Sequence, residues 1–137
     1  MSDACPCHSG QPYAACCRPM HQGRAAPTPT ALLRSRYAAY ALGKVGYVIN
    51  TTHPGSPLRQ EDPAAWRREL KQFCAATSFV DLRIDPEEPL SSDQTVVPFH
   101  ASLFQGARDV SFSERSLFVR RQGRWWYVAP TAETSAS

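Results

Sequence analysis

Four of the five cysteines lie together near the start of the chain, at Cys5, Cys7, Cys16 and Cys17. Thiolates are soft ligands, and four of them around one ion form a common structural site for zinc. The alternatives are two disulfide bonds or reactive thiols without a metal. Adjacent cysteines seldom bridge each other, so the pattern favours a zinc ion held by all four.

The segment between the two cysteine pairs must turn sharply if the four sulfurs are to meet. Ser9 and Gly10 suit such a turn, because glycine tolerates positive φ and serine can bond nearby backbone amides. His8 and His21 are alternative ligands by residue type, but four cysteines already complete a tetrahedral site. A complete site has no position for water, so the predicted zinc is structural and not catalytic.

The cysteines belong to a longer pattern, which is Cys5-Pro6-Cys7, Ser9-Gly10, Tyr13 and Cys16-Cys17. This pattern resembles the SEC-C zinc motif, best known from the tail of the protein-translocation ATPase, where it binds a chaperone. The resemblance implies a zinc knuckle that docks a protein partner. Two departures stand out: the spacer 11–15 has no lysine, and His8 stands where glycine is usual. Without lysines, attraction to an acidic partner is lost.

Two charged residues further along the chain fall among apolar positions. On a helical wheel, Arg36 lies within the arc formed by Leu32, Leu33, Tyr37 and Tyr40. Glu114 shares one face of a predicted strand with Val110, Phe112, Ser116 and Phe118.

A buried charge is costly unless it is paired, so Arg36 and Glu114 are expected to act together. They form either a structural pair that joins helix to sheet or the polar base of a ligand pocket. His53 is placed to reach the rim of such a pocket; alternatively, since it precedes Pro54, it is a plain turn residue.

Local signals predict the elements that position these residues. Helices are expected over 31–42, with Thr30 as N-cap and Gly43 as stop, over 45–52, and from Pro63 to about 74, with Asp62 as N-cap. Strands are expected over 80–84, 95–105, 109–121 and 125–130, with a hairpin at Gly106 and a loop over 86–93. Helices followed by antiparallel strands indicate an α+β fold, with the helices on one face of the sheet.

The last strand carries three consecutive aromatic residues, Trp125, Trp126 and Tyr127. Successive side chains of a strand point to opposite faces, so rings lie on both sides of it. This pattern predicts a central strand that is buried on two faces.

Several short motifs extend over most of the chain. They are Leu33-Arg-Ser-Arg-Tyr37, Thr52-His-Pro54, Glu114-Arg-Ser116 with Phe118, and Gly123-x-Trp-x-Tyr127. They resemble the YchJ-like family of bacterial proteins, uncharacterised in function, in which a SEC-C motif precedes a cone-shaped domain similar to nuclear transport factor 2. The resemblance implies helices packed on a curved antiparallel sheet. The expected organisation is a zinc knuckle over 1–20, a linker over 21–30, the cone domain over 31–131 and a disordered tail over 132–137.

Composition narrows the functional class. The chain has 137 residues, 42% of them hydrophobic, and a formal net charge of +3, as expected for one globular domain with a small appendage. No apolar run reaches the roughly 18 residues of a membrane span, so we expect a cytoplasmic protein with no membrane partner. Four metal-bound thiolates and one zinc ion lower the charge to about +1, which disfavours nucleic acid as a partner.

The sequence thus predicts an interaction or adaptor protein whose structural zinc knuckle docks a protein partner. The alternative is a cone domain that binds a small molecule, or acts as an enzyme, in a pocket near Arg36, His53 and Glu114. No nucleophile–base spacing, catalytic metal site or phosphate loop is visible in the sequence, so no catalytic residue is assigned.

Overall fold

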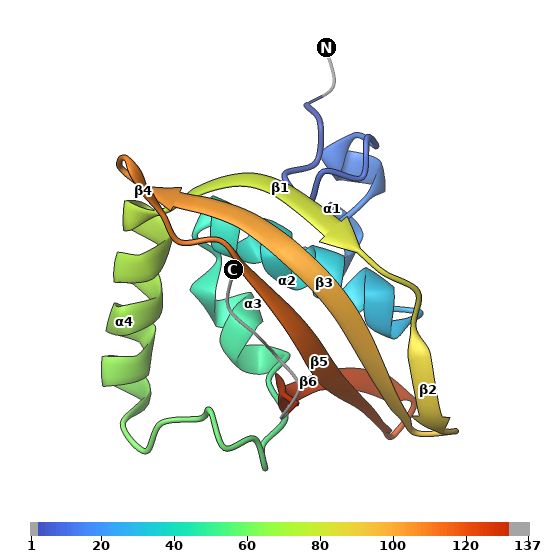
Figure 1. Cartoon of the computed structure of the whole chain (residues 1–137). Helices are drawn as coiled ribbons and strands as arrows, with labels where there is room; N and C mark the ends of the chain where they lie inside the picture. Colours follow the sequence, from blue (N-terminus) through green and yellow to red (C-terminus); the bar gives the residue numbers. More distant parts are fainter. Residues whose placement is uncertain (1–2, 132–137) are drawn as a thin grey trace.

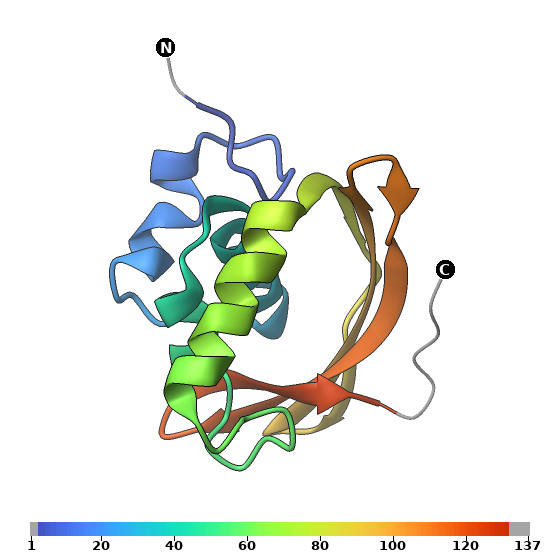
Figure 2. The same ribbon diagram turned by 90° about the vertical axis from the view of Figure 1, so that its left-hand side faces the viewer.

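The protein is a curved antiparallel sheet with helices packed on its concave face, as Figure 1 and Figure 2 show. The computed structural model describes residues 3–131. The predicted α+β class is confirmed, and the predicted disordered tail over 132–137 lies outside the described residues. Within 3–131, no helix is both long and apolar enough to cross a membrane.

The N-terminal segment has little regular structure of its own. It contains the single 3-10 turn η1 (Tyr13–Ala15) and the short helix α1 (Arg18–His21). An isolated bridge pairs Ala4 with Pro12. A segment with so little regular secondary structure needs either a metal or the rest of the chain to hold its shape.

Helix α2 (Pro29–Leu42) is the central helix of the fold. Its N-cap is Thr28, whose hydroxyl accepts a hydrogen bond from the backbone N–H of Ala31 at 3.0 Å. The prediction of Thr30 as the N-cap is therefore wrong. Pro29 occupies the first helical position, where its missing N–H costs nothing, and the Thr30 hydroxyl instead donates to Glu87 at 2.6 Å. The predicted stop at Gly43 is confirmed, with a φ of 73°.

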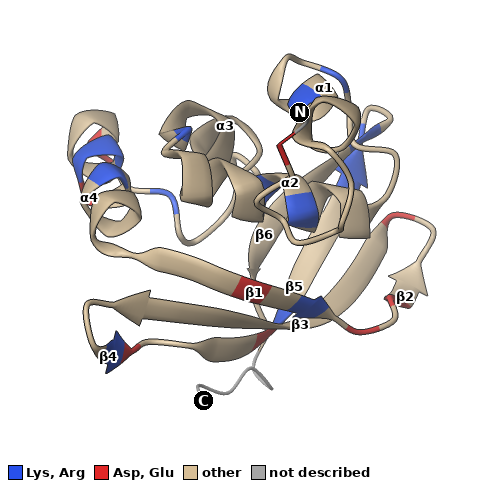
Figure 3. Ribbon diagram, turned by 90° about the horizontal axis from the view of Figure 1, so that it is seen from above, with Lys and Arg blue, Asp and Glu red and all other residues tan. Residues whose placement is uncertain are grey.

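Two further helices complete the helical layer. Helix α3 (Val45–Asn50) is slightly shorter than predicted. Helix α4 (Pro63–Ala76) starts as predicted, because Asp62 accepts hydrogen bonds from Ala64 N and Ala65 N. Figure 3 shows that lysine and arginine residues are concentrated on the helical layer, α4 in particular, whereas most acidic residues lie along the sheet and its loops.

The sheet has six strands, all antiparallel to their neighbours. Its main path is β1-β3-β5-β6, while β2 and β4 both pair with β3. The bounds are β1 (Ser78–Ile84), β2 (Glu88–Ser91), β3 (Gln94–Gln105), β4 (Arg108–Asp109), β5 (Phe112–Arg121) and β6 (Arg124–Pro130).

The segment 86–93 is not purely a loop as predicted, because it contains strand β2. Strand β1 pairs with β3 only from Phe99 onward and leaves the first part of β3 open along that edge. Strand β2 fills this gap, with Glu88 opposite Val96. Pairing between distant segments, which no local pattern reports, decides this element.

Strand β6 ends the sheet, so the prediction that it is a central strand is wrong. The chain just after α3 runs beside this edge and bonds to it: Tyr127 N donates to Thr51 O at 3.0 Å, and His53 N donates to Tyr127 O at 2.8 Å. The exposed edge of β6 is thereby partly protected, which explains why it carries aromatic residues on both faces.

The core lies between α2 and part of the concave face of the sheet. Its fully buried members include Leu32 and Ala38 from α2 and Val97 and Phe118 from the sheet. Three of the clustered cysteines belong to the same contiguous core. The N-terminal segment and the cone are therefore packed as one body.

Candidate functional site

The four N-terminal cysteines converge on one point. Their sulfur atoms all lie within 4.8 Å of one another, with Cys7 Sγ 3.6 Å from Cys16 Sγ and Cys16 Sγ 3.9 Å from Cys17 Sγ. A tetrahedral ion with metal–sulfur bonds of about 2.3 Å separates its ligands by about 3.8 Å. The cluster therefore has the size and ligand chemistry of a four-thiolate metal site.

Backbone turns bring the two cysteine pairs together. Cys5 N donates to Gln11 O at 2.8 Å, and His8 N donates to Cys5 O at 3.1 Å. Both Gly10 and His8 have positive φ, 87° and 64° respectively. The left-handed conformation of His8 explains why glycine is usual at that position of the motif, since only glycine adopts it without strain.

The sulfurs of the cluster differ in how readily they lose a proton. Hydrogen bonding from Cys17 lowers the pKa of Cys7 to about 4, despite burial. Burial raises the pKa of Cys5 to about 11, and sharing a proton with Cys7 raises the pKa of Cys17. Metal binding to such a cluster must displace the protons that remain on the other sulfurs, so its affinity depends on pH.

The two histidines near the cluster are used for other contacts. The Nε2 atom of His8 lies 3.1 Å from Phe79 O. His21 Nδ1 lies 2.6 Å from Tyr13 Oη, and its Nε2 donates to Ser35 O at 2.7 Å. Burial lowers the pKa of His21. Neither imidazole belongs to the sulfur cluster, which leaves the four cysteines as the candidate ligands.

The knuckle, the segment of residues 3–20 that carries the cluster, is fixed to the cone domain. Arg34 Nη1, on α2, donates to Cys7 O at 3.2 Å. The ring of His8 lies 5.8 Å from the ring of Tyr37, edge to face. His21, just beyond the knuckle, bonds to Ser35 O. The knuckle thus braces the outer side of α2, the helix whose inner side faces the sheet.

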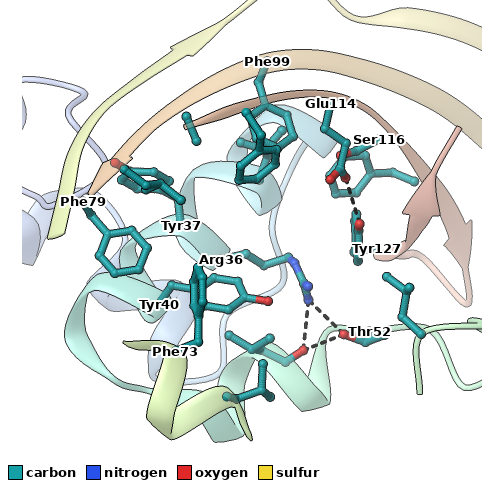
Figure 4. A pocket seen from close by; sticks show the side chains of 18 of the residues that line it. Arg36, Tyr37, Tyr40, Thr52, Phe73, Phe79, Phe99, Glu114, Ser116 and Tyr127 are labelled. Atoms are coloured by element: carbon teal, nitrogen blue, oxygen red, sulfur yellow. Dashed lines mark hydrogen bonds between the residues drawn. The ribbon is translucent and has the colours of Figure 1, made fainter. Parts of the chain in front are cut away.

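A cavity of about 330 Å³ lies between the helices and the concave face of the sheet. Helices α2, α3 and α4 and strands β1, β3, β5 and β6 all contribute to its wall. Most of the lining is aromatic or aliphatic, and Figure 4 shows rings of several elements pointing into it. The labelled rings of Tyr37, Tyr40, Phe73 and Phe79 lie toward one end, which we call the ring end, while Phe99 lies between them and Glu114, its partner across the pairing of β3 with β5.

The opposite end of the cavity, the polar end, is formed by Arg36, Glu114, Ser116, Tyr127 and Thr52 (Figure 4). Arg36 is only 7% exposed, as its place on the helical wheel predicts. Its Nη1 donates to Val48 O at 2.9 Å, to Thr51 Oγ1 at 2.8 Å and to Thr52 Oγ1 at 3.1 Å. The guanidinium also lies over the Tyr127 ring, 4.3 Å from its centroid.

Glu114 faces Arg36 across Tyr127. Its Oε2 accepts hydrogen bonds from the hydroxyls of Ser116 and Tyr127, the latter at 2.8 Å. Among the interactions of residues 3–131, Arg36 and Glu114 form no ion pair with each other. Tyr127 connects them instead: burial raises its pKa, and the Glu114 charge raises it further. The two charges predicted to act together do share one site, with an aromatic residue between them.

His53 lies apart from the polar end and does not line the cavity. Its Nδ1 accepts a hydrogen bond from Gly55 N at 2.9 Å, and its ring packs against Trp126. These contacts are those of a turn residue.

Two members of the polar end were not anticipated as site residues. The sequence pattern gives Tyr127 only a packing role, because it follows two other aromatic residues in the last strand. In the sheet it lies opposite Phe118. Thr52 follows α3 and has no distinguishing local signal. The strands expected over 109–121 and 125–130 follow one another along the chain, so pairing them would have brought Tyr127 beside Glu114, whereas nothing in the sequence places Thr52 there.

Family models match nearly the whole chain. Residues 28–130 match a model described as the YchJ middle domain, which is NTF2-like, and residues 1–19 match the SEC-C motif. The cysteine cluster and the cavity therefore lie in the two parts that these models describe.

Individual relatives agree with this division. A UPF0225 protein of Haemophilus influenzae strain PittEE is 38% identical to this chain, over 96% of this chain and 79% of the relative. A UPF0225 protein of Actinobacillus succinogenes is 37% identical, over 97% of this chain and 84% of the relative. The solution structure of a SEC-C motif containing protein from Rhodopseudomonas palustris superposes with a TM-score of 0.80 at 32% identity, covering 95% of this chain and 98% of the other. A crystal structure of a SEC-C motif containing protein from Psychrobacter arcticus shares the fold, with a TM-score of 0.77 at 24% identity. The match covers 98% of this chain and 84% of the other. The chain therefore belongs to the YchJ family, with a SEC-C motif ahead of an NTF2-like domain.

Proposed function

We propose that the protein binds a small, largely apolar molecule in the cavity between its helices and its sheet. The observation that carries this proposal is the cavity itself, about 330 Å³ lined by rings and aliphatic side chains, with a few polar groups gathered at one end. Small-molecule sites in proteins have this composition and begin at about this size.

The apolar lining of the cavity lacks the contacts of a packed core. Protein interiors are normally close-packed, and side chains that face unfilled space forgo dispersion contacts. Several lining rings, including Tyr40, Phe79, Phe99 and Phe112, are only half-buried although they point inward. A ligand that fills the space would recover the contacts that these rings lack.

The lining supports binding more than catalysis. Among the described residues that form the wall there is no histidine, cysteine or lysine. The carboxylate of Glu114 could act as a general base by residue type, but it accepts hydrogen bonds from the hydroxyls of Ser116 and Tyr127. His53, which the sequence places near the rim of such a pocket, bonds within its own turn. A binding or carrier role is therefore the function that this geometry supports best.

Two exposed leucines provide a matched test. Leu58 lines the cavity and is 46% exposed, so it lies at the rim, whereas Leu90 is 62% exposed on β2 and lies outside the cavity. The probe is N-phenyl-1-naphthylamine, a neutral dye that fluoresces strongly only in apolar surroundings. We expect saturable binding at one site, weakened roughly tenfold by Leu58→Trp and unchanged by Leu90→Trp. Absence of saturable binding, or equal effects of the two substitutions, would contradict the proposal.

We further propose that the metal of the knuckle is zinc and that its role is structural. The support is the four-sulfur donor set, which leaves no position for water and suits zinc best. Elemental analysis of the purified chain should find about one zinc per chain, and a Cys16→Ser, Cys17→Ser variant should lose it. Another metal in place of zinc, or zinc retained by the variant, would show the assignment to be wrong.

Docking of a protein partner by the knuckle stays a prediction. The knuckle leaves Gly10, Gln11, Ala14 and Ala15 exposed, so a partner would contact it there. An Ala14→Glu, Ala15→Glu variant keeps all four candidate ligands and changes only this surface. If affinity capture recovers the same proteins with this variant as with the wild-type chain, the adaptor hypothesis loses its support.

A further inference from the structure

The polar end of the cavity holds a buried cation that lacks a counter-ion. Arg36 is 7% exposed, and no carboxylate within residues 3–131 forms an ion pair with it. Three of its hydrogen bonds leave from Nη1 and end on uncharged oxygens. Guanidinium also carries donors on Nη2 and Nε, and a further hydrogen bond of Arg36 goes to the hydroxyl of Tyr40, which is again uncharged. No donor of this guanidinium therefore meets a carboxylate among the described residues. The most favourable acceptor for a guanidinium is a carboxylate.

The same end holds an anion that is only partly satisfied. Both assigned hydrogen bonds of Glu114 end on Oε2. Its Oε1 has no hydrogen-bond donor among the described residues, and the side chain points into the cavity (Figure 4). A ligand that carries an N–H⁺ group would supply that donor.

These two groups together restrict the charge of the ligand. A simple anion would pair with Arg36 but be repelled by Glu114, and a simple cation would meet the reverse problem. A hydrocarbon would cover both charges and satisfy neither, which is costly in an apolar site. A head group with a negative and a positive charge side by side satisfies both.

We propose that the ligand is a small zwitterion with a hydrophobic body, of the kind represented by an α-amino acid with an aromatic side chain. Its carboxylate would lie against Arg36, and its ammonium group would lie against Glu114. Tyr127 separates the two protein charges, with its ring face toward Arg36 and its hydroxyl bonded to Glu114, so one short head group can contact both. This inference rests on the proposed binding function and specifies its ligand class.

The ring end of the cavity suits the body of such a ligand. The rings of Tyr40 and Phe73 have centroids 5.9 Å apart, and those of Phe73 and Phe79 6.1 Å. Nearer to Glu114, the rings of Phe99 and Phe112 continue the apolar wall with centroids 5.7 Å apart. These are edge-to-face spacings typical of aromatic clusters. A further ring or a branched aliphatic group can extend such a cluster.

The test uses the wild-type chain and three forms of one probe. L-phenylalanine is the zwitterion, its methyl ester keeps only the ammonium group, and N-acetyl-L-phenylalanine keeps only the carboxylate. Binding is measured by displacement of N-phenyl-1-naphthylamine. We expect L-phenylalanine to bind at least about tenfold more tightly than either masked form.

Variants assign the charges to their partners. Glu114→Gln keeps the shape of the side chain and an acceptor oxygen but removes the charge. It should therefore weaken the binding of L-phenylalanine and strengthen the binding of N-acetyl-L-phenylalanine. Arg36→Met should weaken the binding of L-phenylalanine and strengthen the binding of its methyl ester. Circular dichroism checks that each variant is folded, and the three-ligand comparison on the wild-type chain stands even if a variant fails to fold.

The outcomes separate the two proposals. If the dye binds but either masked form equals or exceeds L-phenylalanine, or if none of the three displaces the dye, the zwitterion is the wrong ligand class while the cavity remains a binding site. If the dye itself does not bind at a saturable site, the proposed function fails as well.

Discussion

At the scale of single residues, the account depends on a chain of three side chains. Arg36 lies on one face of the Tyr127 ring, and the hydroxyl of that tyrosine donates to Glu114. Each of the two charges would be expensive to bury alone. The tyrosine keeps them apart, so that both stay available on the cavity side.

The hydroxyl of Tyr127 should contribute measurably to stability. Tyr127→Phe removes one of the two donors to Glu114 and should lower the free energy of unfolding by about 1–3 kcal/mol. Urea denaturation measures this loss. The Tyr127 hydroxyl bonds to the charged carboxylate of Glu114. Glu114→Gln should therefore lower the free energy of unfolding less in the Tyr127→Phe background than in the wild-type chain. Strict additivity of the two changes would show that this hydrogen bond contributes nothing.

His21 should make the stability of the protein depend on pH. Burial lowers its pKa in the folded chain, whereas the unfolded chain has the ordinary value of about 6.5. Below that pH the unfolded chain takes up a proton that the folded chain resists, so stability falls as the pH drops through about 6.5 and levels off below the folded pKa.

A His21→Gln variant provides the comparison, because acid-driven loss of metal affects both proteins. The free energy of unfolding, measured between pH 7.5 and pH 5 (chosen to span the value of about 6.5), should fall more steeply in the wild-type chain. Parallel pH profiles would contradict the assignment of this dependence to His21.

At the scale of elements, helix α2 connects the two candidate sites. Its outer side holds the knuckle through Arg34 and Ser35, and its inner side supplies Arg36 and Tyr40 to the cavity. The start of this helix is set by Thr28 and Pro29. Anything that shifts α2 therefore moves both sites together.

The cap of α2 can be tested directly. Thr28→Ala removes the hydroxyl that accepts from Ala31 N and should lower the unfolding free energy by about 0.5–2 kcal/mol. Thr28→Ser keeps the hydroxyl and should change it by only a few tenths. Thermal or urea unfolding of the three proteins decides the point, and equal stability of all three would mean that Thr28 does not cap the helix.

Elements with strong local signals were predictable from the sequence. The start of α4 at Asp62-Pro63 and the stop of α2 at Gly43 follow from residue type alone. The Thr28-Pro29 pair carried the same cap signal as Asp62-Pro63, so the error at Thr30 was avoidable. Strand β2 and the edge position of β6 depend on which distant segments pair, and local patterns contain no such information.

The candidate sites divide in the same way. The four cysteines are close in sequence, so their convergence could be predicted. The inward position of Arg36 and Glu114 followed from the periods of a helix and a strand. The cavity between them results from how side chains on seven elements pack, and whether such a space is open or filled depends on side-chain volumes across the whole fold.

At the scale of the whole molecule, the knuckle and the cone behave as one structural unit. Cys5, Cys7 and Cys17 share a contiguous core with Phe118 and Tyr127, which lie on the sheet. The candidate metal site is thus joined to the cavity wall through continuous packing. This arrangement gives the knuckle a role in stability whether or not it also docks a partner.

Removal of the metal should therefore weaken the cone as well as the knuckle. A strong chelator should lower the midpoint of thermal unfolding and reduce dye binding in the wild-type chain, because the four thiolates would no longer hold the support of α2 in place. The Cys16→Ser, Cys17→Ser variant should start lower and show no further change with chelator. An unchanged midpoint in the wild-type chain would mean that the knuckle contributes nothing to the stability of the cone.

The most direct test of the central claim is a crystal structure of the full chain grown with N-phenyl-1-naphthylamine. The account predicts electron density for the dye inside the cavity, with its rings among Tyr40, Phe73 and Phe99 and with Arg36 and Glu114 still on either side of Tyr127. A cavity closed by its own side chains, or dye bound only on the outer surface, would contradict the claim that this protein is built around a small-molecule site.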